Sequence, residues 1–372
     1  MIKGHGDMKL AVNLLMLLIS LVISCLFGEF IIRMVYPQNL TGQCFEYTDK
    51  GLLVNRQKGS SPLQYGKLVI RYNYYYPHLR DTPLKQGGIR VLTIGDSFTF
   101  GFMVDKSNQI TYLLQQDTDK EFGKEKFYFL NAGTSGWGTA DYTAYLEDFG
   151  EIIKPKIVLV ILNTDDIGRS VKSKLFEFMP GSGMDLKRNI LKVSYFKRFV
   201  NSIPGYEWLL EHSHLVQLFK RSWQLATQKS TQKKSSAIRE FGPNSKELRV
   251  PSEYSIKLGQ ALFIRLDKWC RDHGADLYIT TTGWSNEEDV DSLIEPTSVF
   301  MKAAPEFFRS INVPYYDIFS DIQKAKNGAG KRFVFPDGHP NEAGNRLISE
   351  EIWNNLLKDR LQAYLTASGT HH

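Results

Sequence analysis

Cysteine is scarce in this chain, and several common signature motifs are missing from it. The 372 residues include only three cysteines (Cys25, Cys44 and Cys270) and no CxxC pair. This excludes a disulfide-stapled scaffold, a zinc ribbon and a thioredoxin-type redox site. Neither G-x-S-x-G nor G-x-G-x-x-G occurs, so the usual nucleophile elbow and the dinucleotide-binding turn are not indicated either. No cluster of side chains has metal-ligand spacing, and we expect neither a metal nor a cofactor.

What is present is a globular composition with an uneven charge. The chain is 42% hydrophobic and 23% charged, with a net charge of +6. Residues 171–249 hold fifteen Lys and Arg against six Asp and Glu, a balance of +9, so the rest of the chain carries −3. A basic segment invites a nucleic-acid interpretation, but no readout motif accompanies it, and we expect no nucleic-acid partner.

A long apolar run lies near the start of the chain. Residues 10–28 carry no charge and are bounded by Lys9 and Glu29. About 18 apolar residues suffice to cross a bilayer, so we expect a membrane anchor over 10–32, with the folded body outside the cytoplasm on the periplasmic or extracellular face. A cleaved signal peptide, or a lipoprotein lipidated at Cys25, remains an alternative.

Five apolar, β-branched runs separated by helical patterns indicate the fold class. The runs cover residues 90–95, 127–131, 157–162, 276–281 and 313–318. The helical patterns cover residues 109–116, 140–149, 255–273, 298–310 and 341–361. Continuous apolarity marks strands buried on both faces, so we predict an α/β protein, a three-layer sandwich of right-handed βαβ units around a parallel sheet. Ligands of such sheets bind beyond the carboxyl ends of the strands, and functional residues should follow each run directly.

The predicted domain organisation interrupts this sheet with an insertion. We expect a short tail (1–9), the anchor (10–32), an aromatic and loop-rich strap (33–88), the first part of the α/β domain (89–170), a basic helical insertion (171–254), the second part of the α/β domain (255–362) and a tail (363–372). Helical spacing at 192–200, 206–218 and 215–225 supports the insertion. As a cap over the site, its Lys229, Lys233 and Lys234 would hold an anionic glycan or lipid headgroups; a solvated surface is the alternative.

Four polar segments follow predicted strands or precede the last helix. Ser97 opens a helix after the first strand, a nucleophile's placement, although an ordinary helix cap looks the same. The glycine turn NAGTSGWG follows the second strand, and the polar turn NTDD follows the third. In DGHPN, near the C-terminus, Asp337 and His339 can supply an orienting carboxylate and a general base.

Together, GDSFTFG, NAGTSGWG, NTDD and DGHPN resemble the four blocks of SGNH (GDSL-like) hydrolases, over about residues 90–166 and 275–361. The resemblance implies a five-stranded, flavodoxin-like sheet. It implies Ser97 as nucleophile, His339 as base, and the N–H groups of Ser97 and Gly136 as part of the oxyanion hole.

Two departures from that pattern matter. The Asp stands two residues before His339 rather than three, a D-x-H spacing that looks like membrane-linked polysaccharide O-acetyltransferase relatives. The third block normally reads G-x-N-D, and here its Asn falls on Asp165, with Asn163 at the Gly position. Either Asn163 donates to the oxyanion, Asp165 is held neutral, or the third donor is lost, which typically costs roughly 100- to 1000-fold in rate.

These observations lead to a functional hypothesis with two alternatives. The chain is expected to be a membrane-anchored serine esterase or O-acyltransferase acting on acyl, foremost acetyl, esters of a cell-envelope glycan, with envelope polysaccharide-modification proteins as partners. Trp137, with Trp284, would stack on the sugar. The alternatives are a lipase or thioesterase on lipid acyl esters, and a catalytically degenerate module that binds polysaccharide or serves as a scaffold.

Overall fold

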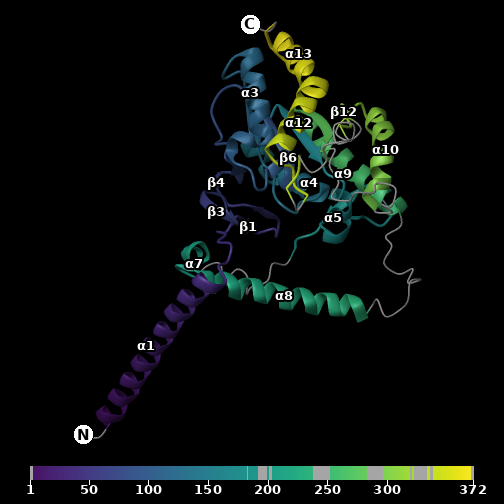
Figure 1. The fold of residues 1–372 in the computed structure, drawn as a ribbon. Helices are drawn as coiled ribbons and strands as arrows, with labels where there is room; N and C mark the ends of the chain where they lie inside the picture. The colour runs from purple at the N-terminus through teal and green to yellow at the C-terminus, as the bar shows by residue number, and fades with distance from the viewer. Residues whose placement is uncertain are drawn as a thin grey trace. The chain divides into compact units, whose positions relative to one another are not determined.

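The computed structural model describes residues 3–181, 183–191, 199–200, 203–237, 252–282, 296–318, 321, 333–335 and 338–369. The chain divides into two compact units (Figure 1). The anchor unit comprises Met1–Gln43, Ser61–Val69 and Tyr195–Leu248. The sheet unit comprises Cys44–Ser60, Ile70–Ser194 and Arg249–His372. Each is described by itself.

The sheet unit is built on a five-stranded parallel sheet with the order β12-β11-β8-β6-β7. The strands are β6 (Ile89–Gly95), β7 (Phe127–Asn131), β8 (Ile157–Leu162), β11 (Asp276–Thr281) and β12 (Tyr315–Tyr316). Numbered along the chain, these five strands run 2-1-3-4-5 across the sheet, the flavodoxin-like order, and the strand order reverses between β6 and β8. Loops after the carboxyl ends of these two strands therefore diverge and leave room for a site.

Two hydrophobic cores cover the two faces of the sheet and make the three layers. Alternate residues of β8 enter opposite cores: Val158, Val160 and Leu162 face one, and Ile157, Leu159 and Ile161 face the other. The first core is closed by α4 (Thr139–Ile153), α9 (Ser252–Asp272) and α10 (Pro296–Ser310). The second is closed by α3 (Ile110–Phe122), α12 (Glu342–Ile352), a π-helical segment (Trp353–Leu357) and α13 (Lys358–Gly369). Burial on both faces is why these strands read as unbroken apolar runs.

The predicted fold class is confirmed. Three of the five runs coincide with strands β7, β8 and β11, and β6 begins one residue earlier than predicted. The fifth run, at 313–318, forms only the two-residue strand β12, whose Tyr315 and Tyr316 pair with Ile279 and Thr280 of β11.

Two segments are more ordered than the sequence indicated. The strap contains short strands rather than loops alone: β1 (Phe45–Tyr47), β2 (Leu53–Asn55), β3 (Gly59–Tyr65), β4 (Leu68–Tyr75) and β5 (Leu79–Arg80). Its strands alternate exposed and buried residues, which distinguishes them from the fully buried sheet strands. After β8, the chain forms α5 (Asp166–Ser173) and the hairpin β9 (Phe176–Phe178) and β10 (Leu186–Arg188), all within the sheet unit.

Among its described residues, the anchor unit includes the helices α1 (Lys3–Val35), α7 (Tyr206–His212) and α8 (His214–Ala237). Within the described residues, α1 contains one stretch, Met8–Val35, long and apolar enough to cross a bilayer. Most of its apolar side chains are exposed; Met8 is 58% exposed and Val35 is 77% exposed. The predicted helix at 192–200 lies mostly outside the described residues.

Candidate active site

Ser97 begins the short helix α2 (Ser97–Phe100) directly after β6, at the reversal of strand order. Asp96 caps this helix, because its carboxylate accepts a hydrogen bond of 2.9 Å from the Phe98 N–H. Asp96 is therefore the helix cap, and the nucleophile interpretation applies to the next residue, Ser97. As the first residue of the helix, Ser97 presents an N–H that the helix itself does not use.

Ser97 and His339 are 242 positions apart in the sequence but lie side by side in the structure. The Ser97 Oγ lies 2.9 Å from the His339 Nε2. The imidazole is flanked by two rings, with centroids 5.3 Å away at Phe98 and 4.9 Å away at Phe102. A hydroxyl within hydrogen-bond reach of an imidazole, at the carboxyl end of a buried strand, is the geometry of an activated serine nucleophile.

His339 is held in a short turn that leads into α12. The Phe335 N–H donates to the His339 carbonyl at 2.8 Å, and Val334 bridges to Pro340. Asn341 then caps α12 by accepting from the Gly344 N–H at 3.1 Å. Asp337, the predicted orienting carboxylate, lies outside the described residues.

The other two motif segments also converge on residues next to Ser97. The Thr134 N–H, in the glycine turn, donates to the Gly95 carbonyl at 3.1 Å. The Asn163 Nδ2, in the polar turn, donates to the Asp96 Oδ2 at 2.9 Å. Hydrogen bonds connect all four segments. The polar residues that follow the strands therefore lie in one place rather than in four separate loops.

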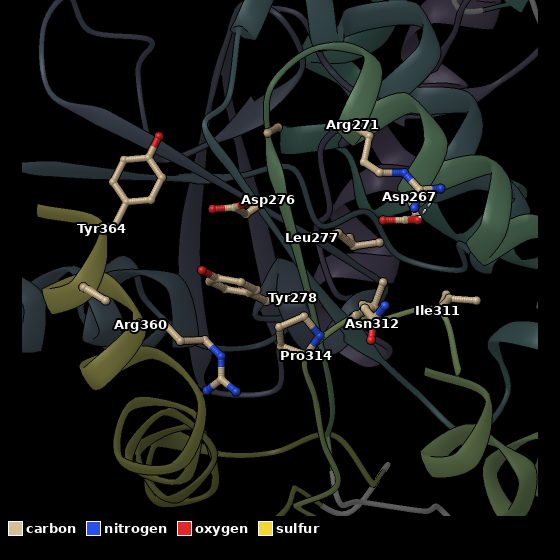
Figure 2. Close-up of a pocket in the computed structure, with 13 residues that line it drawn as sticks. Asp267, Arg271, Asp276, Leu277, Tyr278, Ile311, Asn312, Pro314, Arg360 and Tyr364 are labelled. Carbon is tan, nitrogen blue, oxygen red and sulfur yellow. Dashed lines mark ion pairs between the residues drawn. The ribbon is translucent and has the colours of Figure 1, made fainter. Parts of the chain in front are cut away.

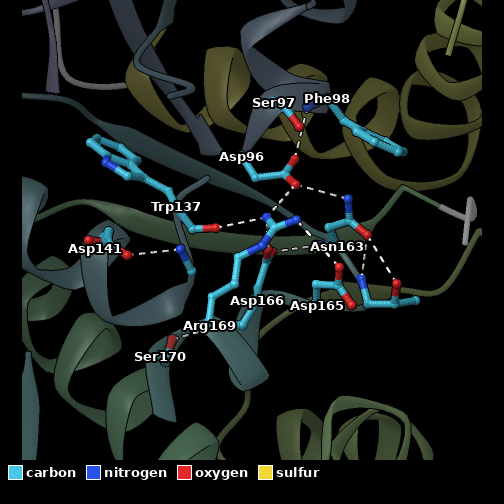
Figure 3. A network of polar contacts seen from close by, with 12 residues as sticks. Asp96, Ser97, Phe98, Trp137, Asp141, Asn163, Asp165, Asp166, Arg169 and Ser170 are labelled. Carbon is cyan, nitrogen blue, oxygen red and sulfur yellow. Dashed lines mark hydrogen bonds and ion pairs between the residues drawn. The ribbon is translucent and has the colours of Figure 1, made fainter. Parts of the chain in front are cut away.

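Arg169 is a residue of the site that the sequence did not indicate. Its guanidinium Nη1 lies 2.8 Å from the Asp96 Oδ2, 3.1 Å from the Trp137 carbonyl and 3.4 Å from the Asp166 Oδ1 (Figure 3). Asp96 and Asp166 are completely buried. Arg169 therefore provides the positive charge that balances two buried carboxylates beside Ser97. Its place three residues after Asp166 on a helix is the only sequence signal that could have suggested this pairing.

Electrostatics in this network follow from burial. Burial, reinforced by the charge of Asp96, raises the pKa of Asp166 well above its usual range. The Tyr142 hydroxyl and the Asn163 N–H both donate to the Asp166 Oδ2 at 2.6 Å and so oppose the rise. Although burial works against the guanidinium, the two carboxylates raise the pKa of Arg169, which stays charged. The Asp96 carboxylate accepts hydrogen bonds from three donors: the Phe98 N–H, the Asn163 Nδ2 and the Arg169 Nη1.

The proposed third oxyanion donors are both engaged elsewhere. The Asn163 amide donates to Asp96, and its Oδ1 accepts from the Thr164 N–H at 2.6 Å. The Asp165 side chain, 51% exposed, lies 3.5 Å from Arg169. Neither residue can turn to an oxyanion without breaking an existing contact, whereas Gly136 is exposed at a φ of +83° that suits glycine. The arrangement favours backbone N–H groups as the donors.

Trp137 does not fit its predicted role in sugar stacking. Its side chain is 1% exposed and packs against Tyr142 and Tyr145. The indole Nε1 donates to the Leu53 carbonyl at 2.5 Å. A ring without an exposed face cannot stack on a sugar, so we assign Trp137 to the core beneath the glycine turn. Trp284 lies outside the described residues.

The strap supports two loops of the site from behind. The buried Arg80 donates to the carbonyls of Phe100, Gly101 and Val104, at the end of α2 and in the turn that follows it. Asn55 donates through its Nδ2 to the Gly133 carbonyl at 2.9 Å, in the glycine turn. Loop backbones that bear catalytic groups need such fixed partners to hold their geometry.

Asp141 makes the stability of this region depend on pH. Its Oδ2 accepts from the Gly138 N–H at 2.9 Å, and burial raises the pKa of Asp141 to about 6. Because the folded pKa exceeds the unfolded one, the folded state binds the proton more tightly, and this group's contribution to stability falls as pH rises from about 4 to 6. Asp141→Asn keeps an acceptor without the charge, so we expect it to stabilise the protein by about 1–3 kcal/mol at pH 7 and by little at pH 4. Urea unfolding at both pH values checks this, and a variant less stable than the parent at pH 7 would contradict it.

A separate hollow of about 560 Å³ lies at the other end of the sheet (Figure 2). Its lining includes Asp276 and Tyr278 of β11, with Arg360 and Tyr364 of α13. Asp276 is the first residue of β11, so the hollow is at the amino ends of the strands, whereas Ser97 follows a carboxyl end. Ligands of open parallel sheets bind at the carboxyl ends, and we place the chemistry at Ser97. Among the described residues, no group of three or more His, Cys, Asp or Glu could hold a metal ion.

Comparisons with known proteins give only distant matches, all to solved structures. No family model and no curated protein matches the chain. Similar solved structures include a GDSL-like lipase from Parabacteroides merdae, with 10% identity, 73% of this chain and 96% of that one covered, and a TM-score of 0.44. An esterase from Pseudoalteromonas has 14% identity, 73% and 98% coverage, and a TM-score of 0.41. A mutant acetylxylan esterase from Geobacillus stearothermophilus has 11% identity, 73% and 94% coverage, and a TM-score of 0.41. At identities this low, we draw the function from the chemistry of the site.

Proposed function

We propose that this chain is an SGNH-type serine esterase or O-acyltransferase, held at the membrane by α1 with its catalytic unit outside the cytoplasm. The proposal is carried by the Ser97 Oγ, 2.9 Å from the His339 Nε2 at the carboxyl end of β6. The four sequence motifs and the esterases and lipases among similar structures support the same class.

In the proposed mechanism, His339 takes the proton of Ser97 as its Oγ attacks the ester carbonyl. The N–H groups of Ser97 and Gly136 stabilise the oxyanion, and Asp337 orients the imidazole. The protonated His339 then donates to the leaving alkoxide, which departs and leaves an acyl group on Ser97. Water or a sugar hydroxyl, deprotonated by His339, accepts the acyl group and regenerates the enzyme.

For the substrate, we propose acyl esters, foremost acetyl, of a cell-envelope glycan. The D-x-H spacing and the membrane anchor motivate this choice. Transfer and hydrolysis share the acyl-enzyme and differ only in whether a sugar hydroxyl or water accepts the group.

Trapping the acyl-enzyme tests this proposal. The full chain in detergent is incubated with a fluorophosphonate and, separately, with an activated acetyl ester, and the intact mass is measured. We expect one adduct per chain, located at Ser97 by peptide mapping and absent from Ser97→Ala. Ser107→Ala, at an exposed serine in the same half of the sheet unit, is the matched control and should still be labelled.

The outcomes separate the alternatives. Turnover that rises with acyl chain length would identify a lipid esterase or thioesterase, whereas a preference for acetyl esters supports the glycan substrate. Folded protein that neither reagent labels at Ser97 would refute the enzyme proposal and favour a binding or scaffold module.

A further inference from the structure

The start of α8 is held to the end of α1 by the partly exposed carboxylate of Glu29. The Glu29 Oε2 accepts from the Leu215 N–H at 2.9 Å and from the Ser213 Oγ at 2.8 Å. The Glu29 Oε1 accepts from the His214 N–H at 3.0 Å. Free N–H groups at a helix start favour a negative charge, so Glu29 caps α8 as a residue from another helix. The acidic residue that ends the apolar run of α1 is thus structural.

The same junction orients the faces of α8 relative to α1. Arg33 donates to the His212 carbonyl at 3.0 Å, whereas Leu215 lies beside Gly28, deeper in the apolar stretch. From this junction α8 runs away across the direction of α1 rather than alongside it (Figure 1). The face of α8 that carries Leu215 is therefore the face nearest the apolar length of α1.

That face carries large aromatic side chains. Phe219 and Trp223 follow Leu215 at four-residue intervals, which places all three on one side of the helix. Phe219 is 71% exposed and Trp223 is 65% exposed. At the start of α8, the opposite side is covered by the anchor unit itself, because Gln217 is 7% exposed and its Nε2 donates to the carbonyls of Thr41 and Leu210. Trp208 of α7 adds a further exposed ring, at 61%.

The charge of α8 has a single sign. Its sequence contains no Asp or Glu and five basic residues, Lys220, Arg221, Lys229, Lys233 and Lys234. Aromatic rings on one face together with Lys and Arg on the same helix are typical of helices that lie in the boundary between lipid and water. Anionic headgroups complement the positive charge, and the aromatic face would leave water for the headgroup layer.

We propose that α8 is an interfacial helix, lying on the bilayer leaflet from which α1 emerges, with Phe219 and Trp223 inserted and its net positive charge balanced by anionic phospholipid headgroups. The basic charge of the insertion then serves lipid binding rather than the substrate. This inference does not depend on any activity of Ser97.

Spin labels on the full chain in vesicles test the orientation. In a Cys25→Ser, Cys44→Ser background, which retains the buried Cys270, a nitroxide is attached at Phe219→Cys or at Arg221→Cys, on a different face of the same helix. In phosphatidylcholine–phosphatidylglycerol vesicles, we expect the label at 219 to be accessible to oxygen and shielded from a water-soluble nickel chelate, and the label at 221 to show the reverse. Equal chelate access at both positions would overturn the proposal, as would a label at 219 shielded from both reagents, which would indicate a protein contact.

A second experiment, which removes positive charge from α8, tests whether anionic headgroups bind this helix. The triple variant Lys229→Gln, Lys233→Gln, Lys234→Gln should raise chelate access at 219 severalfold in anionic vesicles, with little change in purely zwitterionic ones. If the triple variant leaves the label at its parental depth in anionic vesicles but weakens binding of an anionic glycan, the basic residues serve the substrate and the lipid assignment is wrong.

Discussion

Replacing Ser97 by alanine should abolish turnover of acetyl esters, lowering kcat by about 10⁴- to 10⁶-fold. The reason is the contact between the Ser97 Oγ and the His339 Nε2 at 2.9 Å, which makes the pair act as one unit. His339→Ala should lose a similar factor, and the double variant should lose little more than either single one, because a base without its nucleophile has nothing to activate. Initial rates with an activated acetyl ester, for all three variants, measure this.

Folding controls keep that result interpretable. Removing one hydroxyl from Ser97, which is 7% exposed, should change thermal stability little, so the melting temperature of Ser97→Ala should match the parent. Ser107→Ala should retain full turnover. If Ser97→Ala kept more than a tenth of the parental rate, the nucleophile would be another residue and the proposed mechanism would be wrong.

Arg169→Ala should destabilise the sheet unit by about 3–5 kcal/mol, because it leaves a buried carboxylate without its partner. Asp96 and Asp166 are both fully buried, and the Arg169 Nη1 contacts each of them. Urea unfolding with an unchanged m-value measures the loss. The deficit should shrink as pH falls through the raised pKa of Asp166, because protonation of Asp166 removes charge that Arg169 balances.

Arg271→Ala provides the matched control for that prediction. Arg271 also pairs with an aspartate, Asp267, at 2.8 Å, but its side chain is 64% exposed. Solvent screens such a pair, so the variant should lose less than about 1 kcal/mol. Equal losses in the two variants would show that Arg169 contributes no more than a surface pair. Arg169→Ala should also lower turnover, since Asp96 caps the helix that begins at Ser97.

The extent to which the fold could be predicted differs between its parts. Strand β8 is buried at all six positions, so its apolar run marks it without any tertiary information. The sequence predicts a loop-rich strap, because strands such as β3 and β4 mix polar with apolar residues and pair in a small sheet of their own, in the order β3-β4-β5. Such pairings depend on packing more than on local propensity.

For the candidate site, the motif residues were identifiable but their surroundings were not. Ser97 and His339 stand in local patterns that predict their chemistry, and the structure brings them together. Trp137 stands next to Gly136 in sequence yet points into the core, because side-chain direction is set by the turn and by what packs beneath it. Arg169 has no motif, and only the folded chain shows that it meets Asp96.

The sequence by itself determined the classes of element: an apolar run long enough for a membrane, buried parallel strands, and polar residues after their carboxyl ends. These follow from the period and length of apolar patterns, which are local properties of the chain. Only the tertiary structure decided that Glu29 caps α8, that Arg169 neutralises Asp96, and that Trp137 is core. Each of these depends on which distant groups burial brings within hydrogen-bond distance, and a buried charge or polar group must find such a partner to be tolerated.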